Sequence, residues 1–439
     1  MAILSLPVNL QHTFRSLGRR NYRLYFIGQG FSLIGTWMQM IAMPWLVYRL
    51  TGSVFLLGFV GFTSLIPSFI LTPIAGVMLD RWNRHRVMLV TQILAMLQAF
   101  MLAGLFFTGA IQIWHIIVLG VFLGCINAFD MPTRQSFVID LVEDKKDLGN
   151  AIALNSSMFN GARLIGPSIA GIIIAVTGEG VCFLINGASF IFIIAALLLI
   201  KIPPREAKNH AGHIDDFKAG FKYAFGFPPI RTIIILLALF SLVGMPYAVM
   251  MPEIVKKVLH GGPNTYGFLM ASTGIGALTG AFYLASRKTV VGLLRIIPIS
   301  TALFGCGLVL FSLSHSFWLS AGLMYFSGLG MMTQMAASNT ILQTIVDDDK
   351  RGRVMSIFTL SFMGIAPFGS LLAGSVGSAI GAPATLTIGG GACVLGAVLF
   401  AFQLRAIRKF VHPIYVRLGI LPPVPACVPT AIQLTTPRE

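Results

Sequence analysis

The stretch Gly76-Val-Met-Leu-Asp80-Arg81-Trp-Asn-Arg84-His-Arg86 decides the fold of this chain. Its polar part, from Asp80 to Arg86, lies between two long apolar runs. This short connection contains three arginines and a histidine, and it is too short to form a separate loop in solvent. Because basic residues in short links gather at a membrane surface, we expect the two apolar runs to turn back on each other there.

The composition is typical of a helical membrane protein that crosses the bilayer many times. Of the 439 residues, 56% are hydrophobic and 10% are charged, and the mean hydropathy is +0.83. The apolar runs are about 20 residues long, enough to cross a hydrocarbon core of about 30 Å. A net charge of +16 would favour nucleic acid as the partner of a soluble protein. Here loop lysines and arginines account for it, and no nucleic-acid partner is expected.

Further features of the sequence exclude other classes of protein. The first apolar run begins near Tyr22, after Arg15, Arg19 and Arg20, and is too long for a cleavable signal peptide. The five cysteines are scattered without a CxxC pair, so we expect neither a disulfide framework nor a metal site. The sequence has no nucleotide-binding loop and no hydrolase motif, which predicts no enzyme and no cofactor.

Twelve apolar runs predict an all-α membrane protein with twelve transmembrane helices in two six-helix pseudo-symmetric halves. The expected spans are 22–49, 53–79, 87–109, 113–137, 150–176, 180–201, 230–252, 264–286, 292–313, 315–343, 354–380 and 383–405. They divide the chain into an N-terminal half (1–201), a cytoplasmic linker (202–229), a C-terminal half (230–409) and a disordered cytoplasmic tail (410–439). Within the linker, Ile214–Phe225 is expected to form a short amphipathic helix on the membrane surface.

Lysines and arginines set the expected orientation. With an even number of spans both termini share one side, and nearly all of the 31 basic residues fall there. The other side receives only Arg49, Lys256 and Lys257, and Arg163 lies inside a span. The excess of positive charge on cytoplasmic loops therefore places both termini in the cytoplasm.

The two halves repeat one another. Gly166-Pro-Ser-Ile-Ala-Gly171 in the fifth run matches Gly369-Ser-Leu-Leu-Ala-Gly374 in the eleventh, 203 positions later. Six helices, a polar link and six more helices of the same topology are the arrangement of transporters built from two parallel repeats.

The spacing Gly76-x-x-x-Asp80-Arg81-x-x-Arg84 resembles the signature of the major facilitator superfamily, which is roughly G-x-x-x-D-R-x-G-R-R between the second and third helices. The sequence departs from that signature at Asn83, where glycine is usual, and at His85. Since Asn tolerates a left-handed backbone almost as glycine does, we expect the turn to survive.

Three other phrases narrow the resemblance. Asp130–Gln135, Asn155–Pro167 and Arg351–Met355 are similar to the bacterial enterobactin-exporter and macrolide-efflux branch. This resemblance implies a monomeric secondary transporter of the bacterial inner membrane that exports an amphipathic, siderophore-like or drug-like compound by alternating access. Its partners would be a small molecule, protons and the lipid bilayer. The alternative is an uncoupled lipid flippase or a substrate sensor with the same fold.

The resemblance also implies a conformational latch between the halves. In the family the aspartate that matches Asp80 lies near the start of the eleventh helix, where it can meet an arginine such as Arg353. Arg84 would then pair with Asp130 on the fourth helix. Asp130 is also the sole acidic residue that lies inside a span and away from its last turn, which makes it a candidate for proton coupling, although a pair with Arg84 would count against that role. The latch set comprises Gly76, Asp80, Arg81, Arg84, Asp130 and Arg353. The alternative is that these charges only set the topology.

Small residues in the fifth span form a second candidate motif. Gly166, Pro167, Ala170 and Gly171 permit close helix contact and a local bend. They resemble the antiporter signature that ends G-P-x-x-G-G, which in the family marks exporters, although Ala170 replaces one of its glycines. The alternative is ordinary packing of small residues.

Polar side chains inside the spans are the candidate lining of a substrate cavity. Arg163 lies deep in its helix, and a basic residue at that depth marks a functional site by default. The cavity set comprises Gln29, Gln39, Asn127, Asn160, Arg163, Tyr247, Gln334 and Asn339. Arg163 predicts an anionic or catechol-like cargo, unless it only ties down backbone carbonyls or Asn160.

Overall fold

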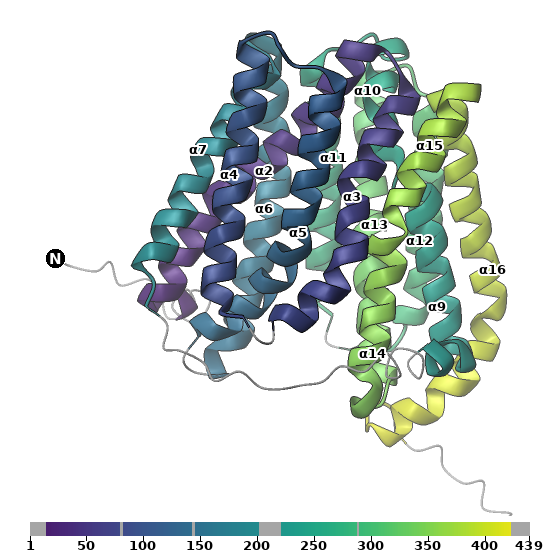
Figure 1. Ribbon diagram of the computed structural model, residues 1–439. Coiled ribbons are helices and arrows are strands. Elements are labelled where there is room, and N and C mark those ends of the chain that lie inside the picture. Colours follow the sequence, from purple (N-terminus) through teal and green to yellow (C-terminus); the bar gives the residue numbers. More distant parts are fainter. Residues whose placement is uncertain (1–14, 80–81, 143–144, 202–220, 288, 423–439) are drawn as a thin grey trace, which may run out of the picture.

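The computed structural model describes residues 15–79, 82–142, 145–201, 221–287 and 289–422, and these residues form helices and no strands. Most of the helices stand side by side along one direction (Figure 1). We refer to the end of the bundle where α2 begins and α16 finishes, at the bottom of Figure 1, as the terminal end, and to the opposite end as the far end.

Six long helices form the N-terminal half. A short 3₁₀ turn precedes them. In chain order the elements are η1 (Arg15–Gly18), α2 (Arg20–Thr51), α3 (Val54–Leu79), α4 (Arg84–Phe107), α5 (Ile113–Leu141), α6 (Lys145–Thr177) and α7 (Glu179–Leu199).

The C-terminal half contains six spans, two of which are interrupted by π-helical turns. In chain order its elements are α9 (Pro228–Leu239), η2 (Phe240–Gly244), α10 (Tyr247–Lys257), α11 (Pro263–Ala285), α12 (Leu293–Ser312), α13 (Phe317–Ile345), α14 (Asp348–Thr359), η3 (Leu360–Gly364), α15 (Ala366–Ile380) and α16 (Ala382–Arg417). Within the described residues, 11 helical segments are long and apolar enough to cross a membrane. The long helix α13 packs between α11 and α12, and with it the structure is compatible with twelve spans in two halves.

The two π-helical turns contact each other. Ser241 in η2 donates a hydrogen bond to the carbonyl oxygen of Phe362 in η3. Pro246 and Pro367 follow the two turns, and because proline has no N–H it removes one rung of the helical ladder. The regular α-helical hydrogen bonding is therefore interrupted at two places in the C-terminal half, and these two places contact each other.

The turn after α3 differs from the expected one at Asn83. This residue has an extended backbone (φ −70°, ψ 108°) and caps α4, because its side-chain oxygen accepts a hydrogen bond from the N–H of Arg86. Asn is a strong N-cap residue, so it acts here as a cap and does not supply the left-handed turn residue that we expected.

The last helix is longer than the sequence indicated. The expected C-terminal half ends at residue 409, but α16 continues to Arg417. The extension is stabilised because Val411 and Tyr415 are buried in the apolar cluster at the terminal end of the C-terminal half. Residues 221–226 are helical and the rings of Phe221 and Phe225 stack; the rest of the expected surface helix lies outside the described residues.

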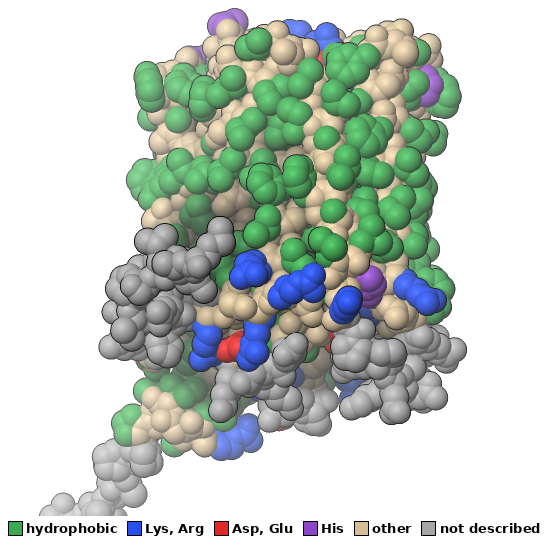
Figure 2. Space-filling view, turned by 90° about the vertical axis from the view of Figure 1, so that its left-hand side faces the viewer, with side chains coloured by type: hydrophobic (Ala, Val, Ile, Leu, Met, Phe, Trp, Pro, Cys, Tyr) green, Lys and Arg blue, Asp and Glu red, His purple; other side chains and the backbone are tan. Residues whose placement is uncertain are grey.

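Apolar side chains cover the face of the bundle that Figure 2 shows. Hydrophobic groups extend over most of its height, and lysines and arginines gather near the terminal end. A wide apolar band with a basic border is the surface that a helical protein presents to a bilayer. This is the multi-pass membrane protein that the hydropathy predicts.

Two glycine crossings join the halves near the far end. Where α3 crosses α15, a Cβ atom added to Gly58 would lie 2.5 Å from the Cα atom of Gly374. Where α6 crosses α11, a Cβ atom on Gly171 would lie 3.0 Å from the Cα atom of Gly267. Only glycine lets two helix backbones approach this closely. Gly171 and Gly374 occupy matching positions in the sequence repeat, so the crossings are related by the pseudo-symmetry.

Candidate functional site: the central cavity

A cavity of about 460 Å³ lies between the two halves. Its walls come from α2, α3, α4, α5 and α7 of the N-terminal half and from α10, α11 and α15 of the C-terminal half. Most of the lining is apolar, and four methionines contribute to it: Met40, Met43, Met245 and Met270. Flexible thioether side chains adapt to ligands of varied shape, so the walls suit an organic molecule.

Asp130 on α5 is the carboxylate of this cavity. It is 3% exposed. Its Oδ1 lies 2.6 Å from Gln92 Nε2 and 3.0 Å from Thr91 Oγ1, both on α4, and its Oδ2 accepts from the Arg134 guanidinium one turn further along α5. Burying a carboxylate is costly unless it is paired and hydrogen-bonded. These three side chains supply the ion pair and the hydrogen bonds.

The pair expected between Arg84 and Asp130 is wrong for this structure. Arg84 instead donates to Asp140, with 3.2 Å between Nη1 and Oδ2. The reason is the length of α5, which continues to Leu141. Asp130 is therefore 11 residues before the helix end, or about 16 Å along the helix axis at 1.5 Å per residue, while Asp140 lies beside Arg84. Arg134 lies inside α5 as well, within the expected span.

A chain of amides crosses the N-terminal half beside the cavity. Gln39 on α2 donates to Gln98 on α4 (Nε2 to Oε1, 3.0 Å) and accepts from Asn186 on α7 (Nδ2 to Oε1, 2.8 Å). Gln98 in turn lies 3.4 Å from the carbonyl oxygen of Leu119 on α5. Four helices are tied together through one network, which also lines the cavity.

We expect Gln39→Leu to destabilise the protein, because the change leaves Gln98 Oε1 and Asn186 Nδ2 without their partners. A stranded buried polar group costs about 1–3 kcal/mol, and interhelical hydrogen bonds in membranes average about 0.6 kcal/mol, so about 1–2 kcal/mol is the expected loss. The measurement is thermal unfolding of the purified protein in detergent. Met101→Leu, at a 53% exposed position on α4, is the control, and an equal effect of both changes would mean that the amide network contributes nothing.

Arg163 lies outside the lining of the cavity, where α6 meets the C-terminal half. Its guanidinium carbon is 5.7 Å from the ring centre of Trp37, and its Nη2 is 3.6 Å from the sulfur of Met331. The buried Tyr247 is within electrostatic range. No carboxylate in the described part of the chain forms an ion pair with Arg163. Arg163 and Tyr247 are thus brought together, but not into the cavity wall.

The other polar residues of the expected cavity set lie in different places. Gln39 and Asn127 line the cavity. Asn160 donates to the carbonyl oxygen of Ser156 on its own helix, and Asn339 accepts from Gln343. Gln29 and Gln334 are fully buried, and neither amide finds a hydrogen-bond partner among the described residues.

Several buried polar atoms near Asp130 retain unused hydrogen-bonding capacity. Within the described ranges, Tyr25 OH, Gln92 Oε1 and Arg134 Nε have no hydrogen-bond partner. Tyr25 interacts electrostatically with both Asp130 and Arg134. Polar groups with this unused capacity suit ordered water.

Sequence reasoning missed part of this site. Gln92, Gln98 and Asn186 were not among the expected cavity residues, although each interrupts an apolar run. On α4, Gln92 and Gln98 lie on one buried stripe with Ala95 and Ala99. The sequence signal that could have found these residues is the helical spacing that places the amides on the same face of α4 as small alanines.

The expected latch is only partly visible. Asp80 and Arg81 lie outside the described residues. Gly76 is exposed near the end of α3, with open space where a Cβ atom would be. Arg353 lies on α14, the first segment of the eleventh span. The latch stays a prediction.

The helix-bend motif lies at helix contacts. A Cβ atom on Gly166 would lie 2.5 Å from the Cβ atom of Trp37 on α2, whereas Gly171 faces α11. Pro167 lies inside α6, and Ala170 is fully buried. The motif thus brings α6 against both halves, and its role as an exporter mark stays a prediction.

Comparisons with known proteins agree with this geometry. A family model described as transmembrane secretion effector matches residues 11–412. The chain belongs to the major facilitator superfamily. Within it the chain falls in the siderophore- and drug-efflux branch, whose members are transporters and not enzymes.

Two relatives and two solved structures illustrate the match. The staphyloferrin A transporter of Staphylococcus aureus is 27% identical over 386 residues, which are 88% of this chain and 96% of that protein. The multidrug efflux pump Tap of Mycolicibacterium fortuitum is 24% identical and covers 80% of this chain and 88% of its own length. A bacterial homologue of the iron transporter ferroportin, in its inward-facing state, superposes with a TM-score of 0.66 at 18% identity over 88% of this chain and 98% of that one. A POT family transporter in complex with 5-aminolevulinic acid has a TM-score of 0.70 at 11% identity, covering 89% and 97%. At these identities the two structures establish the fold alone.

Proposed function

We propose that this transporter exports an amphipathic organic molecule from the cytoplasm in exchange for protons, by rocking its two halves about the central cavity. In this proposal the terminal end is cytoplasmic and the protein works as a monomer in a bacterial inner membrane. The observation that carries the proposal is Asp130, a carboxylate 3% exposed in the wall of a cavity that is lined mostly by apolar groups, with amides, hydroxyls and its ion-pair partner Arg134. Named substrates of the relatives, a siderophore and drugs, support the class of cargo.

Direction and cargo class are tested in whole cells. Cells that lack the protein are loaded with staphyloferrin A or with a lipophilic cationic dye, and retention is compared with that in cells that express the full chain. We expect expression to lower the retained amount of one of these probes several-fold. Equal retention of both probes, with the protein present in the membrane, would contradict the export proposal for these classes.

The proposed negative charge of the cargo rests on Arg163. A guanidinium without a carboxylate partner is costly at this depth, so an anionic, oxygen-rich group that reaches it as the halves rock would be favoured. Arg163→Lys keeps the charge but loses the planar donor fork, and we expect about tenfold weaker binding of staphyloferrin A; Arg163→Gln should weaken it further. The measurement is binding to the purified variants. If the dye binds best and the substitutions leave its affinity unchanged, Arg163 is a structural tie between helices.

A further inference from the structure

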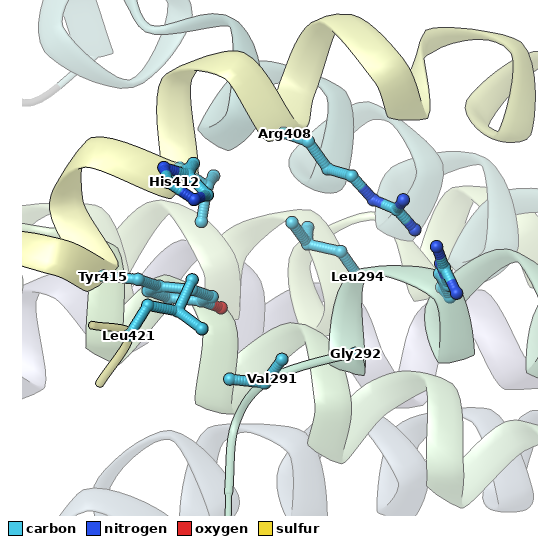
Figure 3. A pocket seen from close by; sticks show the side chains of 9 residues that line it. Val291, Gly292, Leu294, Arg408, His412, Tyr415 and Leu421 are labelled. Carbon is cyan, nitrogen blue, oxygen red and sulfur yellow. The ribbon is translucent and has the colours of Figure 1, made fainter. Parts of the chain in front are cut away.

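A second pocket, of about 310 Å³, lies at the terminal end of the C-terminal half, far from the proposed transport chemistry. It is formed where the first turn of α12 faces the last turns of α16 (Figure 3). Leu294 and Val411 give it apolar walls, and the guanidinium groups of Arg295 and Arg408 give it positive charge.

The two arginines have no counter-charge within the described part of the chain. They interact with each other repulsively, and neither forms an ion pair with a described carboxylate. Asp347 does bind α16, but its partner there is a different arginine: its Oδ1 lies 3.2 Å from Nη2 of Arg417. Like charges held together at the wall of a pocket favour an anionic ligand, and guanidinium groups match phosphate oxygens.

Tyr415 points to the same kind of ligand. It is 5% exposed, and its hydroxyl has no hydrogen-bond partner among the described residues. Figure 3 shows the hydroxyl directed into the pocket, on the side where Leu294 and Val291 lie. A buried phenol hydroxyl normally finds a partner, and here it can donate to an oxygen of a ligand that also contacts the arginines.

The pocket lies at the level of the lipid head groups. Arg408 lies 26 residues after Ala382, the first residue of α16, or about 39 Å along the helix at 1.5 Å per residue. That distance exceeds a hydrocarbon core of about 30 Å, so Arg408 lies in the head-group layer. One turn deeper than Arg295 on α12, Ile299 is 67% exposed and offers a surface for an acyl chain.

We propose that this pocket binds the phosphate of an anionic phospholipid from the leaflet at the terminal end. Arg295 and Arg408 contact the phosphate oxygens, Tyr415 donates a hydrogen bond to the head group, and an acyl chain lies along Ile299. Basic pockets between spanning helices are known to take such head groups. A soluble phosphate ester shares the head-group chemistry but would not use the apolar surface.

The test is native mass spectrometry of the full-length protein in detergent. The probes are dioleoylphosphatidylglycerol, dioleoylphosphatidylcholine as the zwitterionic comparison, and glycerol 3-phosphate as the soluble phosphate ester. We expect phosphatidylglycerol to bind at least tenfold more tightly than either of the others. The double variant Arg295→Gln/Arg408→Gln should lose at least tenfold in phosphatidylglycerol affinity, and Tyr415→Phe about threefold.

Matched controls are Arg405→Gln and Lys409→Gln, which remove basic groups from exposed positions of the same helix that do not line the pocket. They should change the affinity less than twofold. Arg295 is exposed, so the single Arg295→Gln variant should fold normally and lose about threefold by itself. An equal loss in the control variants, or equal binding of the zwitterionic lipid, would overturn the head-group site. Binding of glycerol 3-phosphate as tight as that of the lipid would overturn the lipid assignment.

Discussion

Gly58→Val is expected to reduce transport to less than a tenth of the wild-type rate. A Cβ atom at this position would lie 2.4 Å from the carbonyl oxygen of Ser370 and 2.5 Å from the Cα atom of Gly374. Both atoms belong to the backbone of α15, so no side-chain rotation relieves the contact. Overpacking costs about 1–3 kcal/mol, and 1.4 kcal/mol is a factor of ten in a population. The state with the far end closed would therefore become rare.

Two measurements test this prediction. One is the transport rate, and the other is the distance between two spin labels, one at the start of α3 and one at the end of α15, both at the far end of the bundle. We expect the labels to move apart in Gly58→Val and in Gly374→Val. Gly104→Val is the matched control, because no atom lies within 4 Å of a Cβ atom there. Wild-type transport by a folded Gly58→Val protein would show that the crossing does not have to close.

Asp130→Asn is expected to abolish uphill export while leaving exchange of cargo in both directions. The amide keeps the shape of the side chain, but it cannot exchange a proton with the cavity. It also leaves the Arg134 guanidinium, whose side chain is 24% exposed, without its anion, and removing one partner of a buried pair costs about 3–5 kcal/mol. The single variant should therefore also unfold at a lower temperature.

The double variant Asp130→Asn/Arg134→Gln separates coupling from stability. It removes the stranded charge, so we expect thermal stability to return towards the wild-type value while uphill export stays absent. Asp140→Asn, at the end of the same helix, is the control and should keep coupled export. Full coupling in the double variant would remove Asp130 from the proton pathway.

The sequence predicted the twelve spans and the two-half architecture because apolar runs of membrane-spanning length have few alternative structures. It also predicted that the small residues around Gly171 in the fifth span would permit close helix contact. It ended the fourth span at residue 137, whereas α5 continues to Leu141. It therefore missed Asp140, which lies in this added turn and pairs with Arg84, and it gave Asp130 the wrong partner in place of Arg134.

The candidate site was predictable only in part. Gln39 and Asn127 were expected in the cavity and line it. Arg163 was expected there too, but its contacts with the ring of Trp37 and the sulfur of Met331 place it at the interface between the two halves. Which face of a span points inward depends on how the helices rotate and pack. A hydropathy pattern that is apolar on all sides carries little information about that rotation.

The central claim, export driven by protons through Asp130, is tested most directly in proteoliposomes that contain the purified full-length protein and the exported probe at equal concentrations on both sides. A proton gradient is then imposed across the membrane. We predict that the probe accumulates on the acidic side at least tenfold, that the accumulation collapses when a protonophore is added, and that the Asp130→Asn/Arg134→Gln protein only equilibrates the probe. Equilibration without accumulation by the wild-type protein would contradict the claim and favour an uncoupled carrier.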